Sequence, residues 1–306
     1  MATKSDLPKG IGENIPMGRK ASKQVDFSIV VPVKDEVDLI PTTLPSYYAV
    51  NPSEVIICTD KPTPRKVRRV VQKVAVACDA MDITRIVEVE RDPEWNFHQA
   101  HVRRAGFKEA KHDRLLNVDV DLVINKNVLK AVKLVGKDNI GLVSCEQFHY
   151  PRSLVHLWRI GAKTFSRKIV HRVLESFMEI TMFSGLYALW KPYWLDSEPE
   201  EKIKKLINPK QFYRGEYIEE ISAGVNPTGE DTHLKDCMLE KHRCIYLSDI
   251  GAVTLRDVYE EAPYVEYMKG QYFGRRGRSL LVSVGRAFLR AQPYYFVGYL
   301  HSRIRR

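Results

Sequence analysis

The chain has 306 residues, 44% of them hydrophobic, and a formal net charge of +10 at pH 7. This length allows one large domain or two smaller ones, and the ordinary hydrophobic content excludes an intrinsically disordered chain. The excess of positive charge predicts an anionic partner, which is a nucleic acid, an anionic membrane face or a phosphorylated substrate. Five cysteines without metal-ligand spacing, and no signal peptide or long apolar run, predict a cytoplasmic protein.

The first half of the chain has the pattern of an α/β fold. Residues 1–25, rich in Gly, Lys, Ser and Pro, are predicted to form a flexible arm. Beyond them, β-branched runs alternate with amphipathic stretches at the spacing of right-handed parallel crossovers. We predict strands at 26–33, 54–58, 83–89, 115–118 and 140–145, and helices at 38–48 (broken at Pro41 and Pro45), 65–80, 98–111 and 127–135. Residues 26–150 are therefore predicted to form one half of a domain around a parallel sheet.

The second half has a different pattern, and residues 151–278 are predicted to complete the same domain. We predict helices at 152–179 and 229–241, strands at 181–190, 244–247 and 252–255, and an irregular charged stretch at 196–217. The tail, 279–306, mixes apolar, aromatic and basic residues and is predicted to be helical up to Pro293. That composition fits the headgroup region of an anionic membrane, and it equally fits packing on the core with a solvated basic face.

Two aspartates, Asp119 and Asp121, follow the predicted fourth strand with one residue between them. Strand side chains alternate between faces, so both carboxylates are expected to point the same way. Ligands of α/β sheets bind beyond the carboxyl ends of the strands. Mg²⁺ and Mn²⁺ take one or two carboxylates together with substrate phosphates. The pair predicts a metal–diphosphate site, although a lone Asp-x-Asp is more often a solvated turn.

Several segments, in a fixed order, resemble the family 2 glycosyltransferases of the GT-A fold. They are Ser-Ile-Val-Val-Pro-Val-Lys-Asp-Glu at 28–36, Val-Ile-Ile-Cys-Thr-Asp at 55–60, Val-Arg-Arg-Ala-Gly-Phe at 102–107, Asp-Val-Asp at 119–121, Gly-Leu-Tyr-Ala-Leu-Trp at 185–190 and Gly-Glu-Asp-Thr-His-Leu at 229–234. The resemblance implies a Rossmann-like, mostly parallel central sheet flanked by helices, with a nucleotide-sugar-binding half and an acceptor-binding half. It also implies an inverting, metal-dependent transfer of sugar from a nucleotide-diphosphate donor to an acceptor hydroxyl.

The resemblance assigns roles to the matching positions. Asp231 is the candidate general base with Glu230 beside it, although acids are also favoured in a first helical turn. Asp121 and Asp119 would hold Mn²⁺ or Mg²⁺. Donor contacts fall on Pro32, Val33, Glu36, Asp60, Arg103, Asp119, Val120 and Asp121. Acceptor contacts fall on Gly185, Leu186 and Trp190, and Arg275 and Arg276 would bind the leaving phosphates.

The sequence departs from the family pattern at several positions. Asp60 stands alone where two acids are usual, which leaves open how the base of the nucleotide is recognised. Arg104 stands where an asparagine usually follows the helix arginine, and Asp35 also replaces an asparagine. Residues 253–256, Val-Thr-Leu-Arg, occupy the place of a frequent histidine. The metal is therefore expected to have no protein ligand beyond Asp119 and Asp121.

Two other functions compete with a glycosyltransferase: a basic nucleic-acid-binding protein and a sugar nucleotidyltransferase on a similar sheet. Neither has support in a motif, because no nucleic-acid-binding pattern occurs and the loop after the first strand lacks glycine. The expected partners are a UDP- or GDP-sugar, a glycan or lipid-linked acceptor, and the inner face of a membrane through the basic tail. No nucleic acid is expected, and the sequence identifies neither the sugar nor the acceptor.

Overall fold

The computed structural model describes residues 25–34, 36–149, 185–206, 230–255, 263–275, 279–289 and 292–304. The chain divides into two compact units, which we describe separately. The first unit contains the sheet and the helices that pack on it, and the second contains three C-terminal helices. The arm predicted at 1–25, apart from Val25, and the helices predicted at 152–179 lie outside the described residues.

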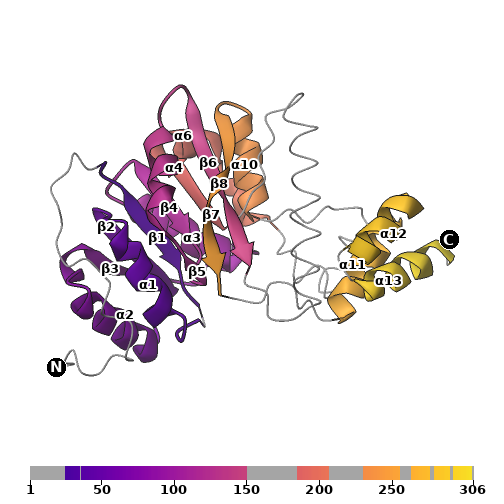
Figure 1. The fold of residues 1–306 in the computed structure, drawn as a ribbon, viewed down its shortest axis with the longest axis horizontal. Coiled ribbons are helices and arrows are strands. Elements are labelled where there is room, and N and C mark those ends of the chain that lie inside the picture. Colours follow the sequence, from indigo (N-terminus) through magenta and orange to yellow (C-terminus); the bar gives the residue numbers. More distant parts are fainter. Residues whose placement is uncertain are drawn as a thin grey trace. The chain divides into compact units, whose positions relative to one another are not determined.

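The described residues of the first unit form a sheet of eight strands in the order β3-β2-β1-β4-β7-β6-β8-β5 (Figure 1). Four strands pair in parallel: β1 (Ser28–Pro32), β2 (Glu54–Asp60), β3 (Thr84–Val89) and β4 (Arg114–Val118). Because Ser28 pairs with both Glu54 and Leu115, the carboxyl ends of β1, β2 and β4 meet at one edge of the sheet. Buried, β-branched strands of this kind need helices on both faces.

Helices cover both faces of this sheet. One apolar core lies under α1 (Ile40–Ala49), α2 (Arg65–Ala77) and α4 (Leu129–Leu134), together with the short 3-10 turns η2 (Met81–Ile83) and η3 (Lys126–Val128). The other core lies under α3 (His98–Glu109), α6 (Lys191–Ser197) and α10 (Glu230–Leu239). A short helix, α7 (Glu200–Lys204), follows α6. The predicted α/β class is confirmed.

The remaining strands make the sheet mixed. They are β5 (Leu122–Val123), β6 (Ile140–His149), β7 (Leu186–Trp190) and β8 (Arg243–Thr254). β7 lies antiparallel between β4 and β6, so Leu186 pairs with Val118 and Trp190 pairs with Arg114. The beginning of β7 therefore lies at the edge where β4 ends.

Four element predictions were wrong. The first helix runs unbroken from Ile40 to Ala49. Pro41 lies in its first turn, where no backbone N–H is needed, and Pro45 is tolerated inside it with a buried side chain. The two strands predicted at 244–247 and 252–255 are one strand, β8, whose pairing in the sheet carries it through the polar residues between them. Helical structure also continues beyond Pro293, which begins α13.

The stretch predicted to be irregular from 196 is also partly helical, since it includes the end of α6 and all of α7. Residues 207–217 of that stretch lie outside the described residues. Glu200 and Glu201 begin α7 and Lys202 and Lys204 end it, an arrangement that complements the helix dipole. Local charge order therefore favours a helix where overall polarity had indicated a loop.

The second unit contains α11 (Pro263–Arg275), α12 (Leu280–Leu289) and α13 (Pro293–Ile304). Glycines let α11 and α13 approach closely, because a Cβ at Gly270 would lie 1.9 Å from the Tyr295 carbonyl oxygen. A Cβ at Gly298 would likewise lie 2.0 Å from the Tyr267 carbonyl oxygen. Among the described residues, no helix combines the length and hydropathy that crossing a membrane requires.

Candidate functional site

The two sequence-predicted aspartates lie in a tight turn at the end of β4. The strand ends at Val118, and the backbone N–H of Leu122 donates to the Asp119 carbonyl at 3.0 Å to close the turn. The buried Tyr47 hydroxyl lies 3.0 Å from the carbonyl oxygen of Asp119 and 2.9 Å from that of Leu122. The argument from strand alternation was wrong, because the turn and not a strand sets the direction of both carboxylates.

Gly185, just before β7, lies against the first of these aspartates. A Cβ at Gly185 would lie 1.9 Å from Oδ2 of Asp119 and 2.6 Å from its Cγ. The Gly185 carbonyl accepts hydrogen bonds from the backbone N–H of Asp119 at 3.2 Å and from Nδ2 of Asn117 at 3.1 Å. Any larger residue here would have to displace the Asp119 carboxylate, which occupies the space of a side chain.

The second aspartate, Asp121, is buried and lies beside the end of β8. Oγ1 of Thr254 is 3.4 Å from Oδ2 of Asp121, and the backbone N–H of Leu255 donates to the Asp121 carbonyl at 2.8 Å. These residues belong to the segment 253–256 that replaces the frequent family histidine. Where the family often has an imidazole, this segment therefore offers a hydroxyl to the Asp121 carboxylate and a backbone N–H to the Asp121 backbone carbonyl.

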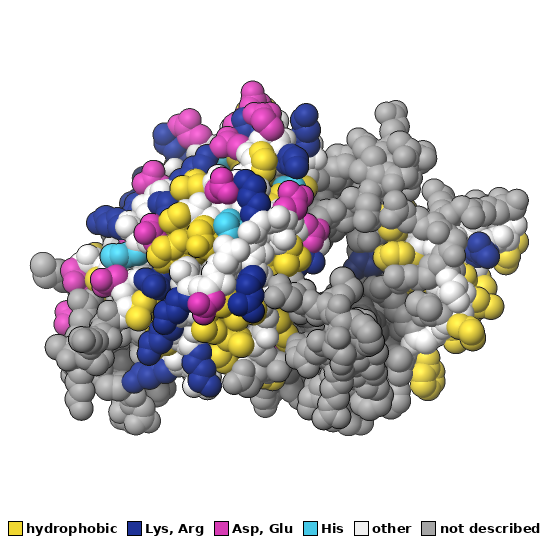
Figure 2. Space-filling view, turned by 90° about the horizontal axis from the view of Figure 1, so that it is seen from above, with side chains coloured by type: hydrophobic (Ala, Val, Ile, Leu, Met, Phe, Trp, Pro, Cys, Tyr) yellow, Lys and Arg dark blue, Asp and Glu magenta, His cyan; other side chains and the backbone are white. Residues whose placement is uncertain are grey.

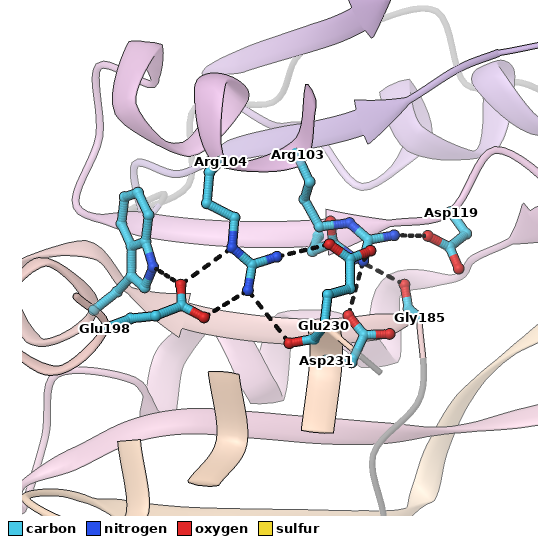
Figure 3. A network of polar contacts seen from close by, with 9 residues as sticks. Arg103, Arg104, Asp119, Gly185, Glu198, Glu230 and Asp231 are labelled. Carbon is cyan, nitrogen blue, oxygen red and sulfur yellow. Dashed lines mark hydrogen bonds and ion pairs between the residues drawn. The ribbon is translucent and has the colours of Figure 1, made fainter. Parts of the chain in front are cut away.

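Two consecutive arginines of α3 connect this turn to the start of α10 (Figure 3). Arg103 donates from Nη2 to Oδ1 of Asp119 at 2.6 Å and from Nη1 to Oδ1 of Asp231 at 2.8 Å, and it also contacts Oε1 of Glu230. Arg104 donates from Nη1 to Oε2 of Glu230 at 2.9 Å. One guanidinium thus bridges the predicted base and the predicted metal ligand.

Arg104 also holds a residue that the sequence did not single out, Glu198. Nε and Nη2 of Arg104 donate to the two Glu198 oxygens at 3.1 and 2.7 Å. Nε1 of Trp194 donates to Oε2 of the same carboxylate at 2.5 Å. We name Arg103, Arg104, Asp119, Glu198, Glu230 and Asp231 the carboxyl-edge cluster.

The carboxyl-edge cluster has more negative than positive charge. Its ion pairs join four carboxylates to two guanidinium groups, so the ionised cluster has two uncompensated negative charges. Burial raises the pKa of Glu230, against the opposing effect of Arg103 and Arg104. Burial also raises the pKa of Asp231, where Arg103 lowers it and the Asp119 carboxylate raises it further. A cation or a proton would relieve this excess.

Other predicted donor residues lie at the same edge of the sheet. Asp60 ends β2 with a half-exposed side chain, and its Oδ1 is 2.9 Å from Nε2 of His98 on α3. Glu36 follows β1, and its carboxylate accepts from the backbone N–H of Lys34 at 3.1 Å. Pro32, Val33 and Val120 are buried there, so their side chains pack in the core and only their backbones are available for contact.

Two predicted acceptor residues are not brought to this group, and two predicted phosphate ligands lie outside the first unit or outside the described residues. Leu186 is fully buried in the apolar core. Trp190 lies at the opposite end of β4, with the Arg114 guanidinium 5.0 Å from its ring centroid. Arg275 ends α11 in the second unit, and Arg276 lies outside the described residues. Of the three predicted acceptor residues, Gly185 alone meets the carboxyl-edge cluster.

Three members or neighbours of the site, Arg104, Glu198 and Trp194, were not predicted from the sequence. A signal for Arg104 does exist in α3, because Arg104 lies four residues after Ala100 and three before Phe107, on the same buried face. Glu198 has no comparable signal, since it is one of many acids in a charged stretch.

Asp119 and Asp121 fit a divalent cation that takes its other ligands from phosphate and water. No group of three or more His, Cys, Asp or Glu suited to a metal ion occurs within the described part of the chain. Mg²⁺ typically needs one or two carboxylates beside substrate phosphates, and a single turn here supplies two. The excess negative charge of the cluster favours such a cation.

Comparisons with known proteins identify the family and the fold. The family described as Glycosyl transferase family 2 matches residues 28–189, more than half of the chain. The comparison with curated proteins found no match. The mannosyltransferase PcManGT from Pyrobaculum calidifontis, solved with GDP-Man and Mn²⁺, has 16% identity and a TM-score of 0.53, covering 91% of this chain and 75% of its own. At this identity the likeness shows the fold.

Two further solved structures are similar to this chain at TM-scores below 0.5. S. aureus TarS has 16% identity and a TM-score of 0.48, covering 92% of this chain and 80% of its own. Glucosyl-3-phosphoglycerate synthase from Mycobacterium tuberculosis, with Mn²⁺, UDP and phosphoglyceric acid, has 15% identity and a TM-score of 0.40. It covers 80% of this chain and 76% of its own.

Proposed function

Because the chain belongs to glycosyl transferase family 2, we propose that its carboxyl-edge cluster supports a metal-dependent, inverting transfer of sugar from a nucleotide-diphosphate donor to an acceptor hydroxyl. One observation carries the proposal. The Arg103 guanidinium donates to both Asp231 and Asp119, so the proposed general base and a proposed metal ligand lie beside the same group. Membership of this family makes the protein a glycosyltransferase. A nucleic-acid-binding protein or a sugar nucleotidyltransferase would not account for the family match.

The donor side of the reaction falls to the acids at the sheet edge. Asp121 and Asp119 would hold Mn²⁺ or Mg²⁺, which when bound neutralises the charge that develops on the leaving diphosphate. Asp60 and Glu36 would accept hydrogen bonds from the nucleoside, since carboxylates accept from base N–H groups and ribose hydroxyls. PcManGT was solved with GDP-Man and Mn²⁺, which supports a GDP-sugar as the donor to test first, with a UDP-sugar as the alternative.

Asp231 would act as the general base. Its Oδ1 is fixed by Arg103, while 29% of its side chain stays exposed to receive an acceptor hydroxyl. Its raised pKa brings its basicity closer to neutral pH, where proton transfer is most effective. The hydroxyl loses its proton to Asp231 as its oxygen attacks the anomeric carbon, and the diphosphate departs from the opposite face. This single displacement inverts the anomeric centre. Arg275 and Arg276 remain our proposal for binding the leaving phosphates.

A membrane-bound acceptor is the second part of the proposal, and the second unit supports it. Leu281 and Phe288 of α12 have 82% and 69% of their surface exposed, and Ile304 of α13 has 81%. Figure 2 shows hydrophobic side chains on the surface of these helices. Residues 279–306 include five arginines and no acidic residue. Apolar side chains beside basic ones suit the surface of an anionic bilayer.

Vesicle sedimentation tests this contact. We expect the protein to sediment with vesicles of phosphatidylglycerol and phosphatidylcholine, and not with phosphatidylcholine alone. Leu281→Ser with Phe288→Ser should abolish the binding, whereas Met81→Ser, an exposed apolar residue of the first unit, should not. Equal binding by the wild type and the double variant would reject the surface.

Nucleotide binding tests the donor site. We would measure melting temperature with UDP, GDP or dTDP, with and without Mn²⁺, in the wild type, Asp121→Ala and Asp113→Ala. Asp113 is exposed at the opposite end of β4 and serves as the matched control. We expect one nucleotide to raise the melting temperature in the presence of metal. At a nucleotide concentration 100 times its dissociation constant, binding adds about 3 kcal/mol to the free energy of unfolding. Asp121→Ala should lose this increase and Asp113→Ala should keep it. No increase with any nucleotide would reject the donor site.

A further inference from the structure

We propose that Arg104 and Glu198 are positioning residues, which place the base Asp231 through their hold on Glu230. The inference rests on the proposed function of Asp231 and concerns how that residue is oriented. It assigns a purpose to an arginine that stands where the family usually has asparagine, and to a glutamate that the sequence did not single out.

The first step is that Arg104 has a single orientation. Its Nε and Nη2 form a fork on the two oxygens of Glu198, while its Nη1 donates to Glu230. Glu198 is itself fixed by Nε1 of Trp194, four residues earlier on the chain. A planar guanidinium bound on two edges cannot rotate without breaking these bonds.

The second step is that Glu230 joins the two arginines. Its Oε2 accepts from Arg104, its Oε1 contacts Arg103, and its carbonyl oxygen lies 3.4 Å from Nη2 of Arg104. Glu230 is the first residue of α10 and Asp231 is the second. Arg104 therefore fixes the start of α10, and with it the backbone from which the Asp231 side chain extends.

The third step is a gradient of exposure along the cluster. The side chains of Glu198 and Arg104 are 0% and 1% exposed, and that of Glu230 is 6% exposed. In contrast, 29% of the Asp231 side chain and 33% of the Asp119 side chain are exposed. The inner end is closed to water, which could otherwise replace a lost partner, and the outer end is open to substrate. The inner end therefore anchors the outer end.

The simpler alternative is that Arg104 only compensates the negative charge of its carboxylate neighbours. A lysine at position 104 would then serve equally well, because it keeps the charge. It would lack the fork that grips Glu198 and Glu230 together, since an ammonium is a point charge on a flexible stem. The difference between Arg104→Lys and the wild type therefore separates positioning from charge compensation.

The experiment compares the wild type, Arg104→Met with Glu198→Met, and Arg104→Lys. The readouts are kcat and donor KM for release of nucleoside diphosphate from GDP-mannose or UDP-glucose, whichever matches the nucleotide that binds. Replacing a buried ion pair by apolar residues is often neutral for stability, so the double variant is expected to fold. The expected result is a loss of about 100-fold in kcat with donor KM within about 3-fold, the scale of a misplaced catalytic group. In Arg104→Lys, kcat should fall by about 10-fold. This variant tests the inference if the double variant does not fold.

The ion pair Arg85–Glu54, at the amino end of the same parallel strands, provides the matched control. Arg85→Met with Glu54→Gln should lower the melting temperature and leave kcat unchanged. Wild-type kcat in both Arg104 variants would overturn the inference. Loss of donor binding in parallel with kcat would also overturn it, because a parallel loss indicates a merely structural role. If the wild type neither binds nucleotide nor releases it from a sugar donor, the proposed function fails instead.

Discussion

Two buried clusters of arginine and carboxylate lie at opposite ends of the parallel strands. At the amino end, Oε1 of Glu54 on β2 accepts from Nε of Arg85 at 2.7 Å. Its Oε2 accepts from the Ser28 hydroxyl at 2.6 Å and from the backbone N–H of Lys111 at 3.0 Å. At the carboxyl end, the carboxyl-edge cluster joins four carboxylates to two arginines. Arg85 also pairs with the more exposed Glu109 at 3.4 Å, so each cluster has two carboxylates for each arginine. The clusters differ in the donors around the buried carboxylate.

The donors around the buried carboxylate decide what each cluster does. Burial would raise the pKa of Glu54, but donors from Ser28, Lys111 and Arg85 outweigh it and leave the pKa lowered. Burial raises the pKa of Glu230 and Asp231, and the two guanidinium groups do not fully offset it. The amino-end cluster therefore stabilises the folded chain as an ionised group. The carboxyl-edge cluster keeps charge that a cation, a proton or a substrate can relieve, which is typical of a functional site.

The largest expected effect is on catalysis at the carboxyl end. Asp231→Asn keeps the shape of the side chain and removes the base. We expect kcat to fall by about 10²–10⁴-fold, the range of general-base catalysis. Metal-dependent nucleotide binding should persist, because the donor carboxylates are untouched. Steady-state kinetics together with the nucleotide melting assay check both points, and a variant with wild-type kcat would remove Asp231 from the mechanism.

A smaller effect is expected from crowding the outer end of the cluster. In Gly185→Ala the new Cβ would collide with the Asp119 carboxylate, which must leave its position beside Arg103. We expect the affinity for nucleotide with Mn²⁺ to fall by about 10-fold, or about 1.4 kcal/mol. Calorimetric titration measures this affinity. Gly285→Ala is the control, because its Cβ would meet nothing within 4 Å, and equal affinities in the two variants would contradict the prediction.

At the amino end, Glu54→Gln should reduce stability without reducing kcat. The loss should be about 1–3 kcal/mol at neutral pH, the cost of weakening a buried, charge-assisted hydrogen-bonding group. Because the pKa of Glu54 is lowered on folding, its contribution is full above the unfolded pKa of about 4.3 and is lost as pH falls through the folded value. Urea unfolding at a series of pH values should show the two proteins converging in acid. A difference that stays constant with pH would contradict the assignment.

The smallest effect has the opposite sign. Because the pKa of Asp231 is raised on folding, its ionised form destabilises the fold once pH rises above the unfolded value of about 3.9. Asp231→Asn should therefore raise the melting temperature at pH 7 without metal, by about 1–3 °C. The gain should disappear near pH 3. A lower melting temperature at pH 7 would show that the bond to Arg103 outweighs the excess of negative charge.

Much of the fold follows from local patterns in the sequence. The β-branched runs predicted β1 to β4 because a buried strand must be apolar along its whole length. The alternation of these runs with amphipathic helices predicted the parallel crossovers. The order of short motifs identified the family, and the two acidic motifs indicated Asp119, Asp121 and Asp231 as members of one site.

Tertiary structure decided what those side chains meet. The sequence does not say which carboxylates Arg103 and Arg104 meet, and only the packing of α3 against α10 brings both to Glu230. Glu198 becomes part of the carboxyl-edge cluster because α6 places it against Arg104. Trp190 matches a motif but lies at the far end of β7, since antiparallel pairing with β4 reverses the strand. Residue types and spacing are local properties that the sequence states directly. The balance of charge in a buried cluster depends on contacts between residues up to 128 positions apart, and only the folded chain makes them.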